Sequence, residues 1–367
     1  MIQLQDIQEA QRRIAGAAVH TPLLAYPGSS STYRLYLKPE SLQPIGAFKI
    51  RGAYNAIASL SEAERRRGVI AHSSGNHAQA VAYAARALGV HAVIVMPRNA
   101  PRIKLDKTRE YGAEVVLVGN ASSDRAERAV ELAQQFGYVP VPPFDDERVI
   151  AGQGTIGLEI LEDLPRLSPN DDDGIGDAAG ISDATVLVPV SGGGLLAGVA
   201  TAIKLSLAQG HYSPLKHIQV IGVEPALAAD AYESFQQGRL VSYTAEQVSR
   251  TVADGLRVQQ LGRLNWPLIQ THVDAIITVS EDEIRAAMRV LALNAKLVAE
   301  PSGAVTMAAW LYHSHQLPSP KLPAQHLPAQ QLPATRQTVA IISGGNVEPD
   351  LLADVLAGAI QPPLPTQ

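Results

Sequence analysis

The sequence predicts an α/β protein built from two open, parallel-rich sheets flanked by helices. Short runs of β-branched and apolar residues alternate along the chain with alanine-rich helical patterns. The runs at 93–95 and 115–118 are apolar on both faces, which is typical of parallel strands covered by helices on each side. The length of 367 residues suits two lobes that each bury a core of their own.

The predicted elements follow one another in a β/α order. The N-terminal segment carries Leu4, Ile7 and Ile14 at helical spacing and predicts a helix. The first half of the chain predicts strands at 69–71, 92–96 and 113–118 and helices at 76–88 and 101–111. The second half predicts strands at 185–190, 217–223, 275–279 and 338–342, with helical segments between them. We therefore expect each half to contribute a sheet.

Two segments interrupt this order and are expected to be surface insertions. Residues 165–183 collect Pro, Asp and Gly with few large apolar side chains, which predicts an exposed loop. Its acidic triplet at 171–173 could attract a cation, but a solvated run of charges is the favoured interpretation. Residues 314–337 contain a Leu-Pro pentad repeated from Leu317 to Arg336, and proline at that density favours an extended surface excursion over a docking motif.

Composition excludes several classes of protein. The formal net charge of -5 offers no basic stripe for a nucleic-acid backbone. No apolar run approaches the roughly 20 residues that span a bilayer, and the N-terminus carries no secretion signal. We therefore expect a cytoplasmic protein with no nucleic-acid or membrane partner. The absence of cysteine excludes disulfides, thiolate metal sites and cysteine nucleophiles.

The first run with chemical content is KPESLQPIGAFKIRGAYN at 38–55, in which Lys49 lies between Phe48 and Ile50. Burial disfavours a charged ammonium group, and a neutral amine can condense with an aldehyde or act as a base. The alternative is a lysine whose stem covers the core while its amine reaches water. For this run alone the solvent-exposed amine is the favoured interpretation. Whether Lys49 is a reactive amine therefore depends on the other runs.

A second run, AHSSGNHAQA at 71–80, ends a predicted strand in small polar residues and begins a helix near Asn76. Backbone N–H groups at the positive end of a helix would fit a substrate carboxylate. Simple capping of the helix by Ser73, Ser74 or Asn76 is about as well supported.

A third run, VPVSGGGLLAG at 188–198, leads from a buried strand through Ser191 and three glycines into a helix. Without side chains, successive N–H groups can surround a phosphate at the helix N-terminus. A dinucleotide site is a poorer interpretation because the G-x-G-x-x-G order is missing. A tight structural turn is the remaining alternative.

Two further runs follow predicted strands. In IISGGN at 341–346, Ser343 could offer its hydroxyl to a heterocyclic nitrogen, although an ordinary serine at a strand end is favoured for the run alone. In EPALAAD at 224–230, Glu224 and Asp230 could supply oxygen ligands for a hard cation. An acid at a helix N-terminus plus a surface aspartate is nearly as well supported.

Together and in this order, the five runs resemble the fold type II pyridoxal-phosphate enzymes of the threonine/serine dehydratase and serine racemase family. The resemblance extends from HTPL at His20 to SGGN at Ser343 and includes AFKIRGA, SSGNHAQA and AGQGTIGLEI. It implies a tryptophan synthase β-like fold with pyridoxal 5'-phosphate in the interdomain cleft. The implied domains are a discontinuous large domain, 1–58 and 148–367, and a small domain, 59–147.

The resemblance also implies roles for individual residues. Lys49 would carry the cofactor as a Schiff base and act catalytically, while Phe48 would pack on the cofactor ring and Asn76 would bond its phenolic oxygen. The residues implied for the phosphate are Ser191, Gly192, Gly193, Gly194 and Leu195, and Ser343 would face the pyridine nitrogen. Those implied for the substrate are Ser73, Ser74, Gly75, Asn76 and His77. A divalent cation (Mg, Mn or Ca) would bind Glu224, Ala228 and Asp230.

The implied reaction is α,β-elimination from small β-hydroxy amino acids such as L-threonine and L-serine, giving a 2-oxo acid and ammonia, in a homodimer. The alternative is a serine racemase, because Ser74 matches the residue that serves as acid/base on the opposite face of the substrate from Lys49. Residues 143–146 look more like the dehydratases.

Two other functions stay open. A hydroxyaspartate dehydratase or racemase shares the SSGNH run, and Arg125 could hold a second carboxylate, although a surface arginine is favoured. A non-catalytic, cofactor-binding regulator is less favoured because Lys49 and Ser343 are retained. The sequence leaves open the preferred substrate, nucleotide activation, the oligomeric state and the role of the Leu-Pro repeat.

Overall fold

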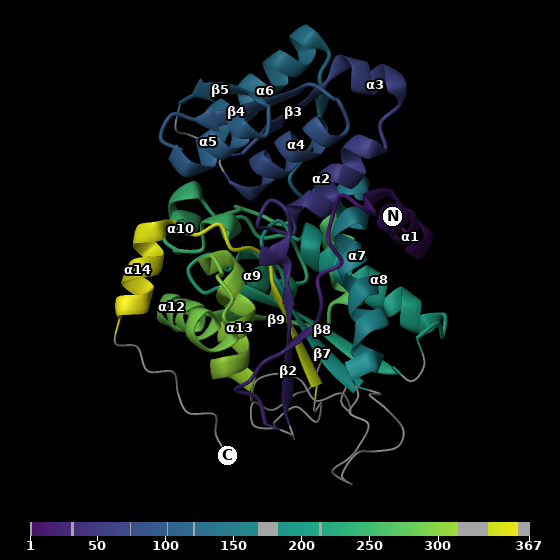
Figure 1. Ribbon diagram of the computed structural model, residues 1–367, viewed down its shortest axis with the longest axis vertical. Helices are drawn as coiled ribbons and strands as arrows, with labels where there is room; N and C mark the ends of the chain where they lie inside the picture. Colours follow the sequence, from purple (N-terminus) through teal and green to yellow (C-terminus); the bar gives the residue numbers. More distant parts are fainter. Residues whose placement is uncertain are drawn as a thin grey trace.

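The computed structural model describes residues 2–30, 33–73, 75–100, 102–119, 122–167, 183–212, 215–314 and 337–358. Apart from short ends, the two predicted insertions lie outside these ranges, and so does Ser74. The described chain forms a six-stranded sheet and a four-stranded sheet, which lie one above the other in Figure 1. The predicted α/β class with two parallel-rich sheets is confirmed.

The six-stranded sheet has the order β1-β2-β10-β7-β8-β9. All neighbouring strands are parallel except β1, which pairs antiparallel with β2. The strands are β1 (Leu24–Ala25), β2 (Arg34–Pro39), β7 (Asp183–Pro189), β8 (His217–Pro225), β9 (Ala275–Val279) and β10 (Gln337–Ile342). Because β7, β8 and β10 are parallel, the turns that follow them leave the sheet at the same edge.

The four-stranded sheet has the order β5-β4-β3-β6 and is parallel throughout. Its strands are β3 (Val69–His72), β4 (Ala92–Pro97), β5 (Glu114–Val118) and β6 (Val139–Pro140). All six residues of β4 are buried, as expected for a central strand covered on both faces.

Helices cover both faces of each sheet. They are α1 (Leu4–Ile14), α2 (Lys49–Ala58), α3 (Glu62–Arg67), α4 (Asn76–Ala87), α5 (Arg102–Glu110), α6 (Ser122–Phe136), α7 (Glu147–Asp163), α8 (Gly194–Ala208), α9 (Asp230–Gln237), α10 (Ala245–Ser249), α11 (Asn265–His272), α12 (Glu281–Val290), α13 (Pro301–His313) and α14 (Pro349–Ala357). Short turns are η1 (Glu40–Leu42), η2 (Leu164–Leu167), η3 (Asp254–Leu256) and the π-helical η4 (Leu291–Ala295). None of the helices in the described ranges is long and apolar enough to cross a membrane.

The side chains of each strand point alternately into two hydrophobic cores, one on each face of the sheet. In β7, Val186 and Val188 pack with α1, α7 and α8, whereas Leu187 packs with α12 and α13 on the other face. In the smaller sheet, Ile94 joins the core under α2 and α4, and Val93 joins the core under α6. This two-sided covering explains why the strands are continuous apolar runs in the sequence.

Helix α2 connects the two parts of the fold. It packs against α7 on one side and α4 on the other, and it lies between the two sheets in Figure 1. A Cβ on Gly152 of α7 would lie 2.6 Å from Cα of Gly52 in α2, so the two helix backbones are in direct contact. The first residue of α2 is Lys49, which is thereby held on a tightly packed helix.

Candidate active site

The Lys49 side chain is partly buried at the start of α2. Its Nζ donates a hydrogen bond to the carbonyl oxygen of Pro143 at 2.8 Å and lies 5.1 Å from the centroid of the Phe48 ring. Desolvation lowers the pKa of the Lys49 amine to about 8. An appreciable fraction of the amine is therefore neutral near physiological pH, the form that attacks a carbonyl carbon or accepts a proton.

Backbone pairing brings the segment before α2 against the turn after β10. The N–H of Phe48 donates to the carbonyl of Ser343 at 3.0 Å, and the N–H of Gly345 donates to the carbonyl of Gly46 at 2.9 Å. Gly46 has φ +72°, and a Cβ there would lie 2.5 Å from Oδ1 of Asn346, so no larger residue fits. Lys49 and Ser343, about 300 residues apart in the sequence, therefore belong to one site.

The Ser343 hydroxyl is buried and donates a hydrogen bond to the carbonyl of Ser302 at 3.3 Å. With its proton used in this way, the hydroxyl oxygen retains lone pairs that can accept a hydrogen bond. A neutral acceptor of this kind suits a pyridine ring nitrogen without imposing a negative charge on it.

The N-terminus of α4 supplies a second group of polar atoms. Asn76 is the first residue of α4, and its Nδ2 donates to Oε1 of Glu300 at 2.6 Å while its Oδ1 accepts from Nδ2 of Asn346 at 2.9 Å. In the turn before the helix, the N–H of Gly75 donates to Oγ of Ser73 at 3.3 Å. The turn thus places the Ser73 hydroxyl just before the positive end of a twelve-residue helix, whose N-cap Gly75 provides no side-chain cap.

His77 in the same helix is held as a neutral imidazole. Its Nε2 lies 2.8 Å from the carbonyl oxygen of Val141. Burial, together with the positive charge of Lys49, lowers the pKa of His77 to about 3. The ring therefore donates to that carbonyl and fixes the α4 N-terminus against the 141–144 segment.

The glycine run forms a tight turn between β7 and α8, with Gly193 at φ +91°. A Cβ on Gly192 would lie 2.4 Å from the ring of Phe144, and one on Gly193 would lie 2.9 Å from side-chain carbons of Leu261 and Ile269. Neighbouring side chains therefore fill the space beside these two glycines, and only glycine allows the backbone to turn so closely at this helix N-terminus. The buried Oγ of Ser191 has no hydrogen-bond partner within the described chain. An unsatisfied hydroxyl beside a glycine cradle at a helix N-terminus fits a phosphate group.

The segment 141–144 connects these groups. Val141 accepts from His77, Pro143 accepts from Lys49, and the Phe144 ring packs over Gly192. The α4 N-terminus, Lys49 and the glycine turn therefore all contact the same four consecutive residues.

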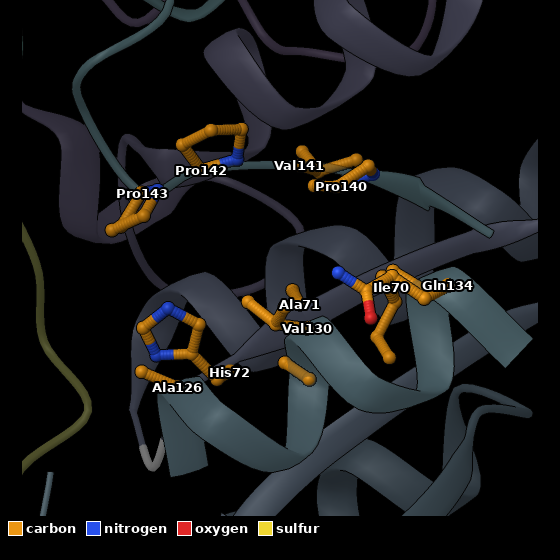
Figure 2. A pocket seen from close by; sticks show the side chains of 12 residues that line it. Ile70, Ala71, His72, Ala126, Val130, Gln134, Pro140, Val141, Pro142 and Pro143 are labelled. Atoms are coloured by element: carbon orange, nitrogen blue, oxygen red, sulfur yellow. The ribbon is translucent and has the colours of Figure 1, made fainter. Parts of the chain in front are cut away.

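A pocket of about 440 Å³ lies beside this segment. Figure 2 shows it between α6 and residues 140–143, with His72 and Pro143 at one end and Ile70 and Gln134 at the other. Its lining is mostly apolar, with side chains such as Ala129 and Val130. A phosphate or a carboxylate needs hydrogen-bond donors, so we do not assign the cofactor to this pocket.

The predicted cation residues lie at the end of β8 and the start of α9. Glu224 is fully buried and accepts from the N–H groups of Ala231 at 3.2 Å and Tyr232 at 2.9 Å. Oδ2 of Asp230 is buried and has no partner within the described ranges. Burial raises the pKa of both carboxyl groups, that of Asp230 to about 7, and the negative charge of Asp230 raises the pKa of Glu224 further. No cluster of three or more His, Cys, Asp or Glu side chains that could hold a metal ion occurs in the described part of the chain.

Sequence reasoning missed several residues of the site. It did not single out Glu300, Asn346 or the carbonyl of Pro143, all of which contact predicted site residues. The sequence AEPSGA around Glu300 did offer a signal, because an acid followed by proline and small residues favours a helix N-terminus.

The fold and this arrangement of lysine, serine and glycine turn define a pyridoxal-phosphate binding protein. The family model described as "Pyridoxal-phosphate dependent enzyme" matches residues 14–322. The chain belongs to this family. It is similar to L-threonine ammonia-lyase of Thermotoga maritima, with 42% identity over 361 residues that cover 97% of this chain and 78% of the relative.

Solved structures of the same family share the whole fold. A T.th. threonine deaminase aligns with a TM-score of 0.78 and 41% identity, covering 95% of this chain and 99% of that one. Maize serine racemase aligns with a TM-score of 0.78 and 34% identity, covering 96% of each chain. The predicted family resemblance is confirmed.

Proposed function

We propose that this enzyme is an ammonia-lyase that eliminates the β-hydroxyl group of L-threonine and L-serine, yielding a 2-oxo acid and ammonia. The observation that carries the proposal is the Lys49 amine, whose pKa is lowered to about 8 at the junction of the glycine turn and the α4 N-terminus. Its similarity to threonine ammonia-lyases supports the choice of reaction.

The described residues fit the cofactor, and we propose their roles accordingly. Lys49 would hold it, with Phe48 against the ring, Asn76 on the phenolic oxygen and Ser343 at the ring nitrogen. The phosphate would be bound by Ser191, Gly192, Gly193, Gly194 and Leu195. When bound, pyridoxal phosphate withdraws electrons from the substrate's α-carbon, which makes the α-proton acidic and assists departure of the β-substituent.

The chain's own groups would then orient the substrate and move protons. The turn made by Ser73, Gly75, Asn76 and His77 would bind the substrate carboxylate through N–H groups at the α4 N-terminus. Lys49 would remove the α-proton, because burial lowers the pKa of its amine to about 8 and so makes the neutral, basic form available. The neutral state of His77 leaves that turn without a competing side-chain charge.

A substrate panel tests the reaction. Purified holoenzyme should release 2-oxo acid from L-threonine and L-serine, measured by a coupled reductase assay. The same samples should be analysed for D-amino acids on a chiral column. Loss of visible cofactor absorption without any product would contradict the lyase assignment.

Serine racemisation is the alternative function, and it depends on Ser74. Inversion at the α-carbon requires an acid/base on the face opposite Lys49, whereas elimination from an L-substrate requires only Lys49 and an acid near the leaving group. Ser74→Ala is expected to abolish formation and use of D-serine while sparing much of the L-threonine deamination. Chiral analysis and 2-oxo acid release measure the two activities separately.

Two results would reject this role for Ser74. Racemisation at the parental rate would mean that another group serves the opposite face. Equal loss of both activities would instead assign Ser74 to carboxylate binding. Arg125→Ala is the matched test for hydroxyaspartate chemistry, since only a dicarboxylate substrate needs that guanidinium group.

We propose that a divalent cation, Mg, Mn or Ca, binds Glu224, the carbonyl of Ala228 and Asp230. The unpartnered Oδ2 of Asp230 and the raised pKa values of two neighbouring buried carboxyl groups support a positive charge at this place. A ligand that binds only the native state raises its stability, so a chelator should lower the melting temperature of the wild type. The effect should be absent in Glu224→Gln; unchanged melting and activity of the wild type would exclude the site.

The remaining proposals concern organisation. We propose a large domain of residues 1–58 and 148–367 and a small domain of residues 59–147, supported by the two separate sheets, whose strands fall within these ranges. We also propose a cytoplasmic homodimer. The side chains of Leu42 and Val298 are 52% and 47% exposed. They lie near each other, because Ser41 and Val298 both lie beside Gly345. A second copy of the chain could cover this apolar surface.

A further inference from the structure

Glu300 is a buried carboxylate beside the site that the predicted roles leave unused. It occupies the N-cap position of α13 and is 3% exposed, but its side chain makes no capping hydrogen bond to its own helix. Instead, Oε1 accepts from Nδ2 of Asn76 at 2.6 Å, across a sequence separation of 224 residues. Glu300 therefore connects α13 to the first residue of α4.

The hydrogen bonds around Asn76 fix the orientation of its amide. Nδ2 of Asn346 donates to the carbonyl oxygen of Ile45 at 2.8 Å and to Oδ1 of Asn76 at 2.9 Å. A carbonyl oxygen only accepts, so the amide nitrogen of Asn346 must lie on that side and Asn76 must turn its oxygen toward it. Asn76 then presents its nitrogen to Glu300, and the second proton of that nitrogen is available to another acceptor.

Keeping an ionisable group at this position destabilises the fold at neutral pH. Burial and the negative charge of Asp254 raise the pKa of Glu300 to about 7, against the lowering effects of Lys104 and of hydrogen bonds from Asn76 and Asn346. The folded protein thus keeps a proton that the unfolded chain loses above its ordinary pKa near 4.5, and stability falls as pH rises between these values. A glutamine at this position would avoid that loss of stability. The presence of a carboxyl group here therefore points to a functional role.

The charged groups that act on Glu300 come from two other elements. Asp254 lies in η3 and Lys104 in α5, and the Lys104 Nζ lies 2.5 Å from Oδ2 of Asp254. The Lys104 side chain is 7% exposed, so water screens this pair only partly. Helix α5 covers the smaller sheet, whereas η3 belongs with the larger one, so the pair spans the two parts of the fold.

We propose that Glu300 is a positioning residue that holds the amide of Asn76 so that its second N–H group points at the phenolic oxygen of the cofactor. The inference rests on the proposed function, because it requires Asn76 to contact that oxygen. Glu300 touches neither the cofactor nor the substrate in this proposal. Its charge acts on the cofactor only through Asn76, and the Lys104–Asp254 pair tunes that charge.

Glu300→Gln and Glu300→Ala holoenzymes test the proposal. We expect kcat to fall about tenfold in Glu300→Ala, which loses one oriented hydrogen bond, and by less in Glu300→Gln, whose amide oxygen can still accept from Asn76 but carries no charge. The KM for L-threonine should change by less than about twofold in either variant. The cofactor dissociation constant, measured by fluorescence during removal of the cofactor, should rise by a similar factor. The visible absorption of bound cofactor should titrate with a midpoint near 7 in the wild type, and this titration should vanish in Glu300→Gln.

The neighbouring charges provide a test of sign. Lys104→Met removes a positive charge and should move the midpoint of the absorption change to higher pH. Asp254→Asn removes a negative charge and should move it to lower pH. Glu283→Gln is the matched control, because Glu283 also contacts α13 but through His313 at the opposite end of the helix. It should leave the spectrum, cofactor affinity and kcat unchanged.

The outcomes separate this inference from the proposed function. Wild-type cofactor affinity, absorption titration and kcat in Glu300→Gln would overturn the positioning role even if deamination is established. Absent deamination by the wild type, with the predicted spectral shifts intact, would overturn the lyase assignment and leave the role of Glu300 supported. If Glu300→Ala does not fold, opposite shifts in Lys104→Met and Asp254→Asn support the role, and unshifted midpoints contradict it.

Discussion

Replacement of Lys49 by Ala is expected to lower the turnover of L-threonine by at least about 10³-fold. The lysine has two tasks, covalent attachment of the cofactor and removal of the α-proton, and loss of a positioned acid/base alone costs about 10²–10⁴-fold. The Pro143 carbonyl that accepts from Nζ would keep its place on the backbone. The variant should therefore fold and still bind the phosphate at the glycine turn.

Single-turnover release of 2-oxo acid, together with visible absorption, checks this expectation. The variant should bind pyridoxal phosphate noncovalently, so dialysis should remove it more readily than from the wild type. Lys204→Met is a control for loss of a lysine outside the proposed chemistry, since Lys204 pairs with Asp274, and its residual activity should far exceed that of Lys49→Ala. Deamination by Lys49→Ala at a wild-type rate would end the proposed mechanism.

The sequence predicted the strands that carry runs of β-branched or apolar residues and missed β1, β2 and β6. The strands at 92–96 and 275–279 were found within one residue of β4 and β9, because buried parallel strands need no polar alternation. Strand β2 was missed because it contains Arg34 and Lys38. Lys38 is fully buried there only because its Nζ pairs with Glu159 at 2.6 Å, a partner 121 residues further along the chain.

The candidate site was predictable where it coincides with the ends of elements. Lys49, Asn76 and the glycine turn each stand at a helix N-terminus, and small or polar residues mark such positions in the sequence. Pro143 and Glu300 could not be assigned in this way. Their contacts with Lys49 and Asn76 cross separations of 94 and 224 residues, so only the folded backbone reveals them.

The run AGQGTIGLEI contains three glycines that serve helix packing. It lies inside α7 (Glu147–Asp163) and forms no loop. A Cβ on Gly154 would lie 2.9 Å from the carbonyl oxygen of Gly198 in α8, and one on Gly157 would lie 2.9 Å from that of Val199. The glycines therefore allow α7 and α8 to pack backbone to backbone, at a propensity cost of about 1 kcal/mol each.

Replacement of Arg51 by Met is expected to destabilise the protein by about 3–5 kcal/mol, because it leaves buried carboxylates without their cation. The guanidinium group is fully buried two residues after Lys49. Its Nε lies 2.8 Å from Oε2 of Glu40, and its Nη1 lies 2.6 Å from Oε1 of Glu159. Lys38 also pairs with Glu159 and lies 3.9 Å from Asp163, so without Arg51 the buried Glu40 and Glu159 carboxylates are left with Lys38 as their remaining cation.

Urea denaturation of the apoprotein measures this effect without involving the cofactor. Desolvation raises the pKa of Glu40, but Arg51 and Lys38 outweigh it, so the pKa is lowered in the folded protein. The ionised Glu40 therefore stabilises the fold at pH values above its unfolded pKa near 4.5. This stability is lost as the pH falls through the lower folded pKa. Arg51→Met should abolish that acid-side loss. The double variant Arg51→Met with Glu40→Gln restores charge balance and should recover part of the stability. Wild-type stability in Arg51→Met, or no recovery in the double variant, would show that the cluster does not hold α2 through its charges.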